Sequence, residues 1–293
     1  MSYSNTSYPP PSSRLEPDQF QAMWKTCETD DPSQLEGYLS TLAPCIDTAH
    51  GLSYCLKVAI RHGPHFTMIE HLVSRHNVQV DGYILESAIS TTTPFPDKAK
   101  LLDYLFDQAD WDVNAPVSAG RTLLSSGIKD KETAEYLLRR GANPNLGRAC
   151  TVAIGYWGAD RLLPESGAVL ASTIRWGSLE VVELLVQYGG VLDYADATHC
   201  AVERDDMDML DKVIELGADV ERMDSWAHFA RDQIGTALHR AIREGKADMV
   251  GVLLDHGADV WSQGRSGKSA IELVDEEGVH QEIRDMVCSA QVP

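Results

Sequence analysis

A short segment containing glycine and lysine is the first candidate for chemistry. Residues Gly264–Ser269 read Gly-Arg-Ser-Gly-Lys-Ser and are similar to the end of a phosphate-binding loop. That loop needs a further glycine five residues before the position of Gly267, so that backbone amides can wrap around the phosphate. Ser262 occupies that position, and no strand pattern precedes it. We therefore predict no nucleotide site here, and we expect no cofactor.

Histidines are the second candidate, because four of them lie close together in the sequence: His62, His65, His71 and His76. The first two have the spacing of ligands one helical turn apart. However, His65 follows Pro64 in an expected turn between helices, and the sequence shows no cysteine or carboxylate that would complete a tetrahedral set. We therefore predict surface histidines and no metal site.

A possible nucleophile and base stand next to each other as Cys200 and His199. Adjacent residues on a helix point in different directions, so these two side chains are not expected to meet. The many Asp and Glu residues fit a solvated outer face better than an acid–base pair. The sequence therefore predicts no catalytic residue, and we expect that the protein is not an enzyme.

The charge balance bears on the class of partner. The chain has 25 Lys and Arg against 44 Asp and Glu, which gives a net charge of −19. Direct binding of nucleic acid or of an anionic membrane needs a basic surface, so both are disfavoured as partners. A basic protein is favoured, although a large charge also serves solubility alone.

The cysteines and the apolar runs indicate the compartment. The six cysteines form no C-x-x-C pair and no disulfide framework, which favours a reducing environment. Residues 1–14 have no apolar core of a signal peptide, and no run approaches the ~18 apolar residues of a membrane span. We expect a cytoplasmic or nuclear protein, and a monomer.

The elements that would position these residues are clearest in residues 233–261. Leu238, Ala241 and Ile242 form one apolar helical face, which Gly245 ends. A second apolar stripe follows over residues 249–254 and ends at Gly257. One such hairpin cannot bury its own apolar face, so it needs copies stacked beside it.

Copies of the closing turn are present at earlier positions. The turn recurs from Asn77, Asp110, Gly141, Gly189 and Gly217, with spacings of 33, 31, 48 and 28 residues. Together with the Thr-Ala-Leu-His opening at residues 236–239, this pattern resembles the ankyrin-repeat family, whose period is about 33 residues. The resemblance implies an all-α solenoid of about eight helical hairpins, one of them truncated or irregular. It also implies that His239 helps to tie neighbouring turns together, and His199 lies at the same position of its repeat.

The expected organisation is a disordered tail over residues 1–16 and one repeat domain over residues 17–290. Residues 146–165 break the period. They can be laid out as a truncated hairpin, with Cys150–Gly158 as its first helix and Leu162 and Leu163 in a stunted second helix, or they can form an irregular loop. The expected repeats are 17–47, 51–81, 82–114, 118–145, 146–165 (truncated), 166–193, 195–221, 232–262 and 267–290.

The resemblance also implies where a partner would bind. Ankyrin proteins usually hold the partner on the concave face, against the first helices and the turn tips. The exposed positions there include Val58, Ser87 and Cys200, each of which follows the histidine position. The strongest candidates combine aromatic and arginine residues, which are enriched at binding hot spots: Tyr156, Trp157, Arg175, Trp176, Glu203, Arg204, Arg240 and Arg243. Alternatively, the tryptophans pack between repeats and the arginines pair with neighbouring acids.

These patterns favour a non-enzymatic adaptor or regulator that binds another protein. By analogy with acidic ankyrin proteins that mask transcription factors, a transcriptional co-regulator is the most concrete role, with a transcription factor as partner. A small-molecule-binding or enzymatic protein is the main alternative. Its pocket would lie near residues 146–176, with Asp160, Arg161 and Arg175 as polar groups. An adaptor for ubiquitination is less favoured, because no recruitment box follows the last repeat.

Overall fold

A computed structural model describes residues 15–44, 46–117, 121–148, 162–224, 235–264, 266–276 and 278–290 of the 293-residue chain. The chain divides into two compact units, Met1–Ala115 and Pro116–Pro293, each of which is described by itself. The described parts of both units are mostly helical, as expected of an all-α fold. Every helix among the described residues is too short or too polar to cross a bilayer.

Unit 1 consists of helices that pack in succession. Helix α1 lies against α3, α3 against α5, and α5 against α6. Two helices begin at a proline, Pro17 and Pro32, where the missing N–H costs nothing, and Asp31 and Asp81 cap α2 and α5 through their side chains. The elements are α1 (Pro17–Lys25), α2 (Pro32–Leu39), α3 (Ala49–Arg61), α4 (Phe66–Glu70), a π-helical turn η2 (His71–Arg75), α5 (Gly82–Ile89) and α6 (Asp97–Ala109).

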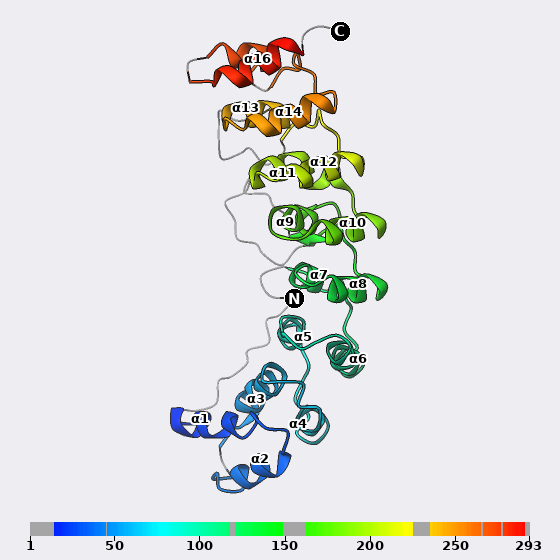
Figure 1. Ribbon diagram of the computed structural model, residues 1–293. Coiled ribbons are helices and arrows are strands. Elements are labelled where there is room, and N and C mark those ends of the chain that lie inside the picture. Colours follow the sequence, from blue (N-terminus) through cyan, green and yellow to red (C-terminus); the bar gives the residue numbers. More distant parts are fainter. Residues whose placement is uncertain are drawn as a thin grey trace, which may run out of the picture. The chain divides into compact units, whose positions relative to one another are not determined.

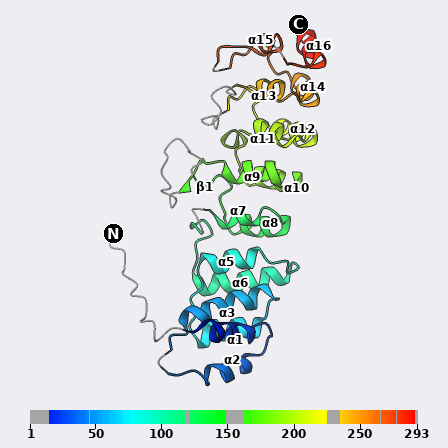
Figure 2. The same ribbon diagram turned by 90° about the vertical axis from the view of Figure 1, so that its left-hand side faces the viewer.

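Unit 2 is a stack of helical pairs (Figures 1 and 2). The first helices contact one another in the order α7, α9, α11, α13 and α15. Among the second helices, α8 packs on α10, α12 on α14 and α14 on α16, and Lys212 of α12 pairs with Glu183 of α10. The bounds are α7 (Leu123–Gly127), α8 (Lys131–Arg139), β1 (Gly147–Arg148), β2 (Leu162–Leu163), α9 (Ala168–Trp176), α10 (Leu179–Gln187), a 3-10 turn η4 (Leu192–Ala195), α11 (Ala197–Arg204), α12 (Met207–Glu215), α13 (Ala237–Arg243), α14 (Ala247–Asp255), α15 (Ala270–Val274) and α16 (Gln281–Ser289).

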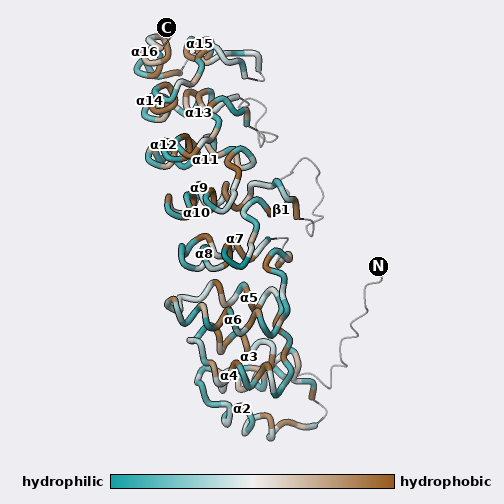
Figure 3. Tube along the Cα trace, turned by 90° about the vertical axis from the view of Figure 1, so that its right-hand side faces the viewer, coloured by the Kyte–Doolittle hydropathy of each residue, from teal (hydrophilic) through white to brown (hydrophobic). Residues whose placement is uncertain are grey.

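Apolar and polar residues alternate along the helices (Figure 3), so each helix has an apolar side that neighbours can bury. The second helices end in the same way. After α14, Gly257 has a φ of 81°, its N–H donates to the Leu254 carbonyl, and the Ala258 N–H donates to the Leu253 carbonyl. Gly217 and Ala218 make the same pair of bonds after α12. The recurring glycine is therefore a helix C-cap that needs the left-handed backbone conformation.

Two buried histidines tie neighbouring repeats together, as the sequence predicted. His239 Nδ1 accepts a hydrogen bond from the Thr236 N–H at 3.2 Å, so its proton lies on Nε2, which donates to the Lys268 carbonyl at 3.0 Å. His199 Nε2 lies 3.0 Å from the Gly235 carbonyl and makes the equivalent link. Each bond joins the start of one first helix to the segment that leads into the next.

The irregular segment differs from the expected truncated hairpin. Gly147–Arg148 and Leu162–Leu163 pair as two antiparallel strands, so the prediction of a stunted second helix at Leu162 and Leu163 is wrong. Pro164 directly follows β2 and disfavours a helical conformation of the residue before it. The first helix predicted for Cys150–Gly158 lies outside the described residues.

The last residue of the expected tail, Glu16, belongs to the start of the first helix. Glu16 accepts a hydrogen bond at the start of α1, and its own N–H donates to Gln19 Oε1 at 3.0 Å. Glu16 is therefore the N-cap of the first helix rather than part of a tail, because its side chain satisfies an otherwise unpaired helical N–H. Residues 1–14 lie outside the described part of the chain.

Candidate protein-interaction site

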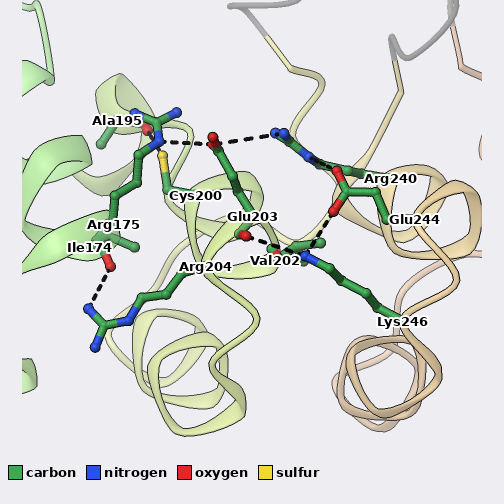
Figure 4. Close-up of polar contacts among 10 residues, drawn as sticks. All are labelled: Ile174, Arg175, Ala195, Cys200, Val202, Glu203, Arg204, Arg240, Glu244 and Lys246. Atoms are coloured by element: carbon green, nitrogen blue, oxygen red, sulfur yellow. Dashed lines mark hydrogen bonds and ion pairs between the residues drawn. The ribbon is translucent and has the colours of Figure 1, made fainter.

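A chain of ion pairs connects three consecutive first helices of unit 2 (Figure 4). Arg175 at the end of α9 donates from Nε to Glu203 Oε2 of α11 at 2.9 Å. The same oxygen lies 3.8 Å from Arg240 Nη2 of α13, and Arg240 Nε donates to Glu244 Oε1 at 2.8 Å. One carboxylate thus lies between two guanidinium groups from the repeats on either side of it.

Lys246 extends this network to the end of α11. Its Nζ donates to the Val202 carbonyl at 2.5 Å and lies 2.8 Å from Glu244 Oε2. A cation at a helix C-terminus satisfies the last carbonyls and interacts favourably with the helix dipole. Partial burial raises the pKa of Glu244, but the hydrogen bonds from Lys246 and Arg240 outweigh it and hold that pKa below its ordinary value. Glu244 is therefore charged at neutral pH.

We call Arg175, Glu203, Arg240, Glu244 and Lys246 the ion-pair network. The sequence analysis named Arg175, Glu203 and Arg240 as candidate partner-binding residues, and it did not name Lys246. The pairing of Arg175 and Arg240 with Glu203 agrees with the alternative in which the arginines pair with neighbouring acids. Arg175, Glu203 and Arg240 belong to three different repeats, so no spacing within one repeat could have revealed the contacts of Glu203 with the two arginines.

Arg204 of α11 bonds to the end of the neighbouring first helix. Its Nη1 donates to the carbonyl of Ile174 at 3.0 Å (Figure 4) and to that of Gly177 at 2.7 Å, and its Nε lies 2.9 Å from Asp206 Oδ2. These bonds cap the end of α9 from the neighbouring repeat. Intramolecular acceptors therefore already bond to the guanidinium group of Arg204, and its role in binding a partner stays a prediction.

Cys200 is buried, and so are Val58 and Ser87, which contradicts their expected exposure. The position after the histidine lies where one first helix packs on the next, as α11 does on α9. The thiol of Cys200 donates to the Ala195 carbonyl at 3.2 Å. Burial raises its pKa to about 12, so the thiolate is not formed at neutral pH and Cys200 is not a nucleophile.

Trp176 is the most exposed of the described large apolar residues. It is the last residue of α9, directly after Arg175, and 83% of its surface is accessible. Tyr156 and Trp157, predicted to lie beside it, are outside the described residues. Arg243 of α13 is half-buried and makes no hydrogen bond or ion pair with any described residue. Trp176 and Arg243 are therefore the sequence-predicted residues in the described part of the face whose side chains remain available to a partner.

The polar groups of the alternative pocket do not converge in the described structure. Asp160 and Arg161 lie outside the described residues, and Arg175 is paired with Glu203. No observation on the described residues therefore favours a small-molecule site near residues 146–176.

The histidine cluster differs from the expectation as well. Glu36 of α2 supplies a carboxylate within hydrogen-bond distance of both His71 and His76, whereas His62 and His65 take no part. The statement that no carboxylate completes the set is therefore wrong. Glu36 belongs to an earlier hairpin than the histidines, so no local ligand spacing in the sequence points to it.

Comparison with known proteins places the repeats in a family. The profile for ankyrin repeats (3 copies) matches residues 170–264. The potassium channel AKT1 of Oryza sativa subsp. indica is 38% identical over 84 residues, which are 29% of this chain and 8% of the channel. Ankyrin repeat and SOCS box protein 11 of Danio rerio is 32% identical over 115 residues, which are 38% of this chain and 36% of that protein. The chain thus matches only a small part of the length of these relatives.

Two solved structures share the fold at low sequence identity. The ankyrin repeat domain of Bcl-3, a member of the IkappaB protein family, aligns with a TM-score of 0.54 at 19% identity and covers 70% of this chain and 85% of that domain. An ankyrin repeat domain from Acinetobacter baumannii AYE aligns with a TM-score of 0.53 at 19% identity, and the alignment covers 72% of this chain and 99% of that domain. Ankyrin repeats generally mediate protein–protein interaction. Residues 170–264 therefore contain ankyrin repeats, and the described helices share the fold of solved ankyrin repeat domains.

Proposed function

We propose that the protein is a non-enzymatic adaptor or regulator that binds a partner protein at the ends of the first helices α9, α11 and α13. The observation that carries the proposal is the exposure of Trp176, at 83%, next to the ion-pair network. A tryptophan on the surface exposes a large apolar area to water, and burying it against a partner removes that cost. Tryptophan is also among the residues most enriched at binding hot spots.

The ion-pair network supports this proposal because it holds the backbone around Trp176 in place. Arg175 is bonded to α11 through Glu203, and Arg204 of α11 caps the end of α9. Trp176 therefore lies at a helix end that bonds from the neighbouring repeat hold in place. A pre-organised anchor loses less conformational entropy when it binds than a mobile one does.

The partner that we propose is a basic protein, and specifically a DNA-binding transcription factor, which would make the chain a transcriptional co-regulator or inhibitor. The net charge of −19 favours a basic partner over nucleic acid itself. The shared fold with a domain of the IkappaB protein family is in keeping with this role. The proposal requires that the protein is present in the cytoplasm, the nucleus or both.

Affinity purification from the native cell, with mass spectrometry, tests the identity of the partner. Binding to the purified partner is then measured for the wild-type chain and for Trp176→Ala. Loss of this side chain is expected to weaken binding by about 2 kcal/mol, which is roughly 30-fold in Kd, with little change in melting temperature. Met207→Ala is the matched control, since Met207 is an exposed apolar residue on α12, in the other row of helices.

Two results would refute the proposal. If Trp176→Ala binds the partner as tightly as the wild type does, the end of α9 is not the interaction site. If the co-purifying molecules are acidic proteins or small metabolites, the proposed partner class is wrong. Nuclear and cytoplasmic fractionation checks the compartment independently, and absence of the protein from both fractions would contradict the role.

A further inference from the structure

A single π-helical turn in unit 1 brings two histidines together. Helix α4 ends at Glu70, and the chain continues as the π turn His71–Arg75, with the N–H of His76 directed at the His71 carbonyl at 3.4 Å. In an α-helix, residues five positions apart would lie about 140° apart around the axis. The wider π turn places them on one side, where their rings lie edge to face with centroids 5.2 Å apart. Such single π turns are frequent at functional sites.

A carboxylate from α2 faces both imidazoles. Glu36 Oε1 lies 2.6 Å from His71 Nε2 and 2.7 Å from His76 Nε2. The histidine side chains are 17% and 18% exposed and that of Glu36 is 37% exposed, so the three groups form a partly buried cluster with an opening to solvent. The hydrogen bond with His71 is the largest influence on Glu36, and with His76 and Arg75 it holds the pKa of Glu36 below its ordinary value.

We propose that Glu36, His71 and His76 form a binding site for a divalent transition-metal ion, with Zn²⁺ as the best fit. Two imidazole nitrogens and one carboxylate oxygen are ligands that Zn²⁺ commonly takes in proteins, with water in the fourth position of a tetrahedron. The three donor atoms already lie within 4.8 Å of one another. The exposed side of Glu36 leaves room for the water.

The change needed to admit the ion is small. Zinc bonds of about 2.0–2.1 Å in a tetrahedron place neighbouring donor atoms about 3.3 Å apart. Glu36 Oε1 is now 2.6–2.7 Å from the two nitrogens, so it must retreat by about 0.6 Å, which a partly exposed glutamate does by rotating its side chain. Arg75 Nε is 3.5 Å from the same oxygen, but this side chain is 68% exposed and can swing into solvent.

The bound ion would join two consecutive hairpins of unit 1. Glu36 belongs to α2, and both histidines flank the turn that ends the following hairpin. A metal that binds only the native state adds its binding free energy to the stability of the fold. This site would therefore stabilise the first two hairpins of unit 1.

The test uses the full chain, freed of metal with a chelator and titrated with Zn²⁺ by calorimetry. One saturable site is expected, together with a rise in melting temperature. His71→Gln and His76→Gln should each weaken binding roughly 100-fold or more, because the affinity of a zinc site is shared among few ligands. Glu36→Gln should weaken it as well. Co²⁺ should give the visible absorption of a four-coordinate site in the wild type and lose it in the variants.

His256→Gln is the matched control. His256 Nε2 lies 2.6 Å from Asp211 Oδ1, so this pair offers one histidine and one carboxylate, with no third ligand among the residues that the structure describes. The control should bind Zn²⁺ as the wild type does. Circular dichroism and melting without metal show whether each variant is folded, and the Co²⁺ spectrum reports ligation directly. Absence of saturable binding in the wild type, or binding that survives both His71→Gln and His76→Gln, would overturn the proposal.

Discussion

Replacement of Arg204 by methionine separates a structural role from a binding role. Methionine keeps most of the aliphatic length of the side chain but removes the guanidinium donors. The change therefore breaks the bonds to the Ile174 and Gly177 carbonyls and the ion pair with Asp206. Asp206 still caps α12, since it accepts from the Met209 N–H at 3.0 Å. The local effect should fall on the contact between α9 and α11.

The size of the effect follows from the number and surroundings of the lost bonds. Hydrogen bonds that involve a charged group contribute about 1.5–3 kcal/mol each when they are well buried. The side chain of Arg204 is 28% exposed, so water replaces part of what is lost, and the partly exposed ion pair with Asp206 adds little. We expect the free energy of unfolding of unit 2 to fall by about 2 kcal/mol.

Urea unfolding followed by circular dichroism measures the loss, and hydrogen exchange locates it. A loss of about 2 kcal/mol corresponds to roughly 30-fold faster exchange of the amides of α9 and α11. Amides of α3 in unit 1 should not change, because stability in repeat arrays is a sum of local terms. Arg243→Met is the matched control and should stay within about 0.5 kcal/mol of the wild type.

The opposite pattern would refute this interpretation. If Arg204→Met unfolds like the wild type but loses the partner, the guanidinium group binds the partner and its intramolecular bonds are incidental. If the variant loses stability but binds with wild-type affinity at a temperature at which it is folded, Arg204 is a capping residue.

Two further predictions concern buried groups of unit 2. Burial lowers the pKa of both His199 and His239, so below the ordinary value of about 6.5 the unfolded chain binds protons that the native state does not. Stability should therefore fall as the pH drops from about 7 towards the native pKa values, and the double change His199→Gln and His239→Gln should flatten this slope in chemical unfolding. An unchanged slope in the double variant would contradict the assignment. Alkylation of the native protein by iodoacetamide should label the exposed Cys288 and spare the buried Cys200, as peptide mass spectrometry can show; equal labelling would mean that α11 opens readily.

Local patterns in the sequence were sufficient to predict the helical hairpins of unit 2. Leu238, Ala241 and Ile242 recur at helical spacing and are all buried on α13, and Gly257 ends α14 in the predicted turn. His239 was expected to link neighbouring turns, and it does so through Lys268. These features depend on residues a few positions apart, so the chain reveals them without its fold.

The irregular segment shows where such patterns fail. Leu162 and Leu163 were expected to be helical because residues 146–165 could be laid out as a truncated hairpin. Their conformation is decided by pairing with Gly147 and Arg148, which lie earlier in the chain across a segment of no clear periodicity. A short apolar run does not distinguish strand from helix, and only the partner strand does.

The exposure of single positions on the first helices also depended on the stack. Cys200 and Trp176 were both assigned to the surface by their place in the repeat, yet Cys200 is buried against the neighbouring repeat and Trp176 is exposed. Cys200 lies within α11, which packs on α9, whereas Trp176 is the last residue of α9.

The spacing of apolar residues and closing glycines was enough to predict the fold class and most helices and turns of unit 2, because these depend on interactions within one repeat or between equivalent positions of adjacent repeats. The contacts of Glu203 with Arg175 and Arg240, and those of Glu36 with His71 and His76, follow only from the packing of the helices. Side chains that meet across repeats are brought together by the rise and rotation of the stack and by one π turn. The spacing of residues along a single helix encodes none of these features.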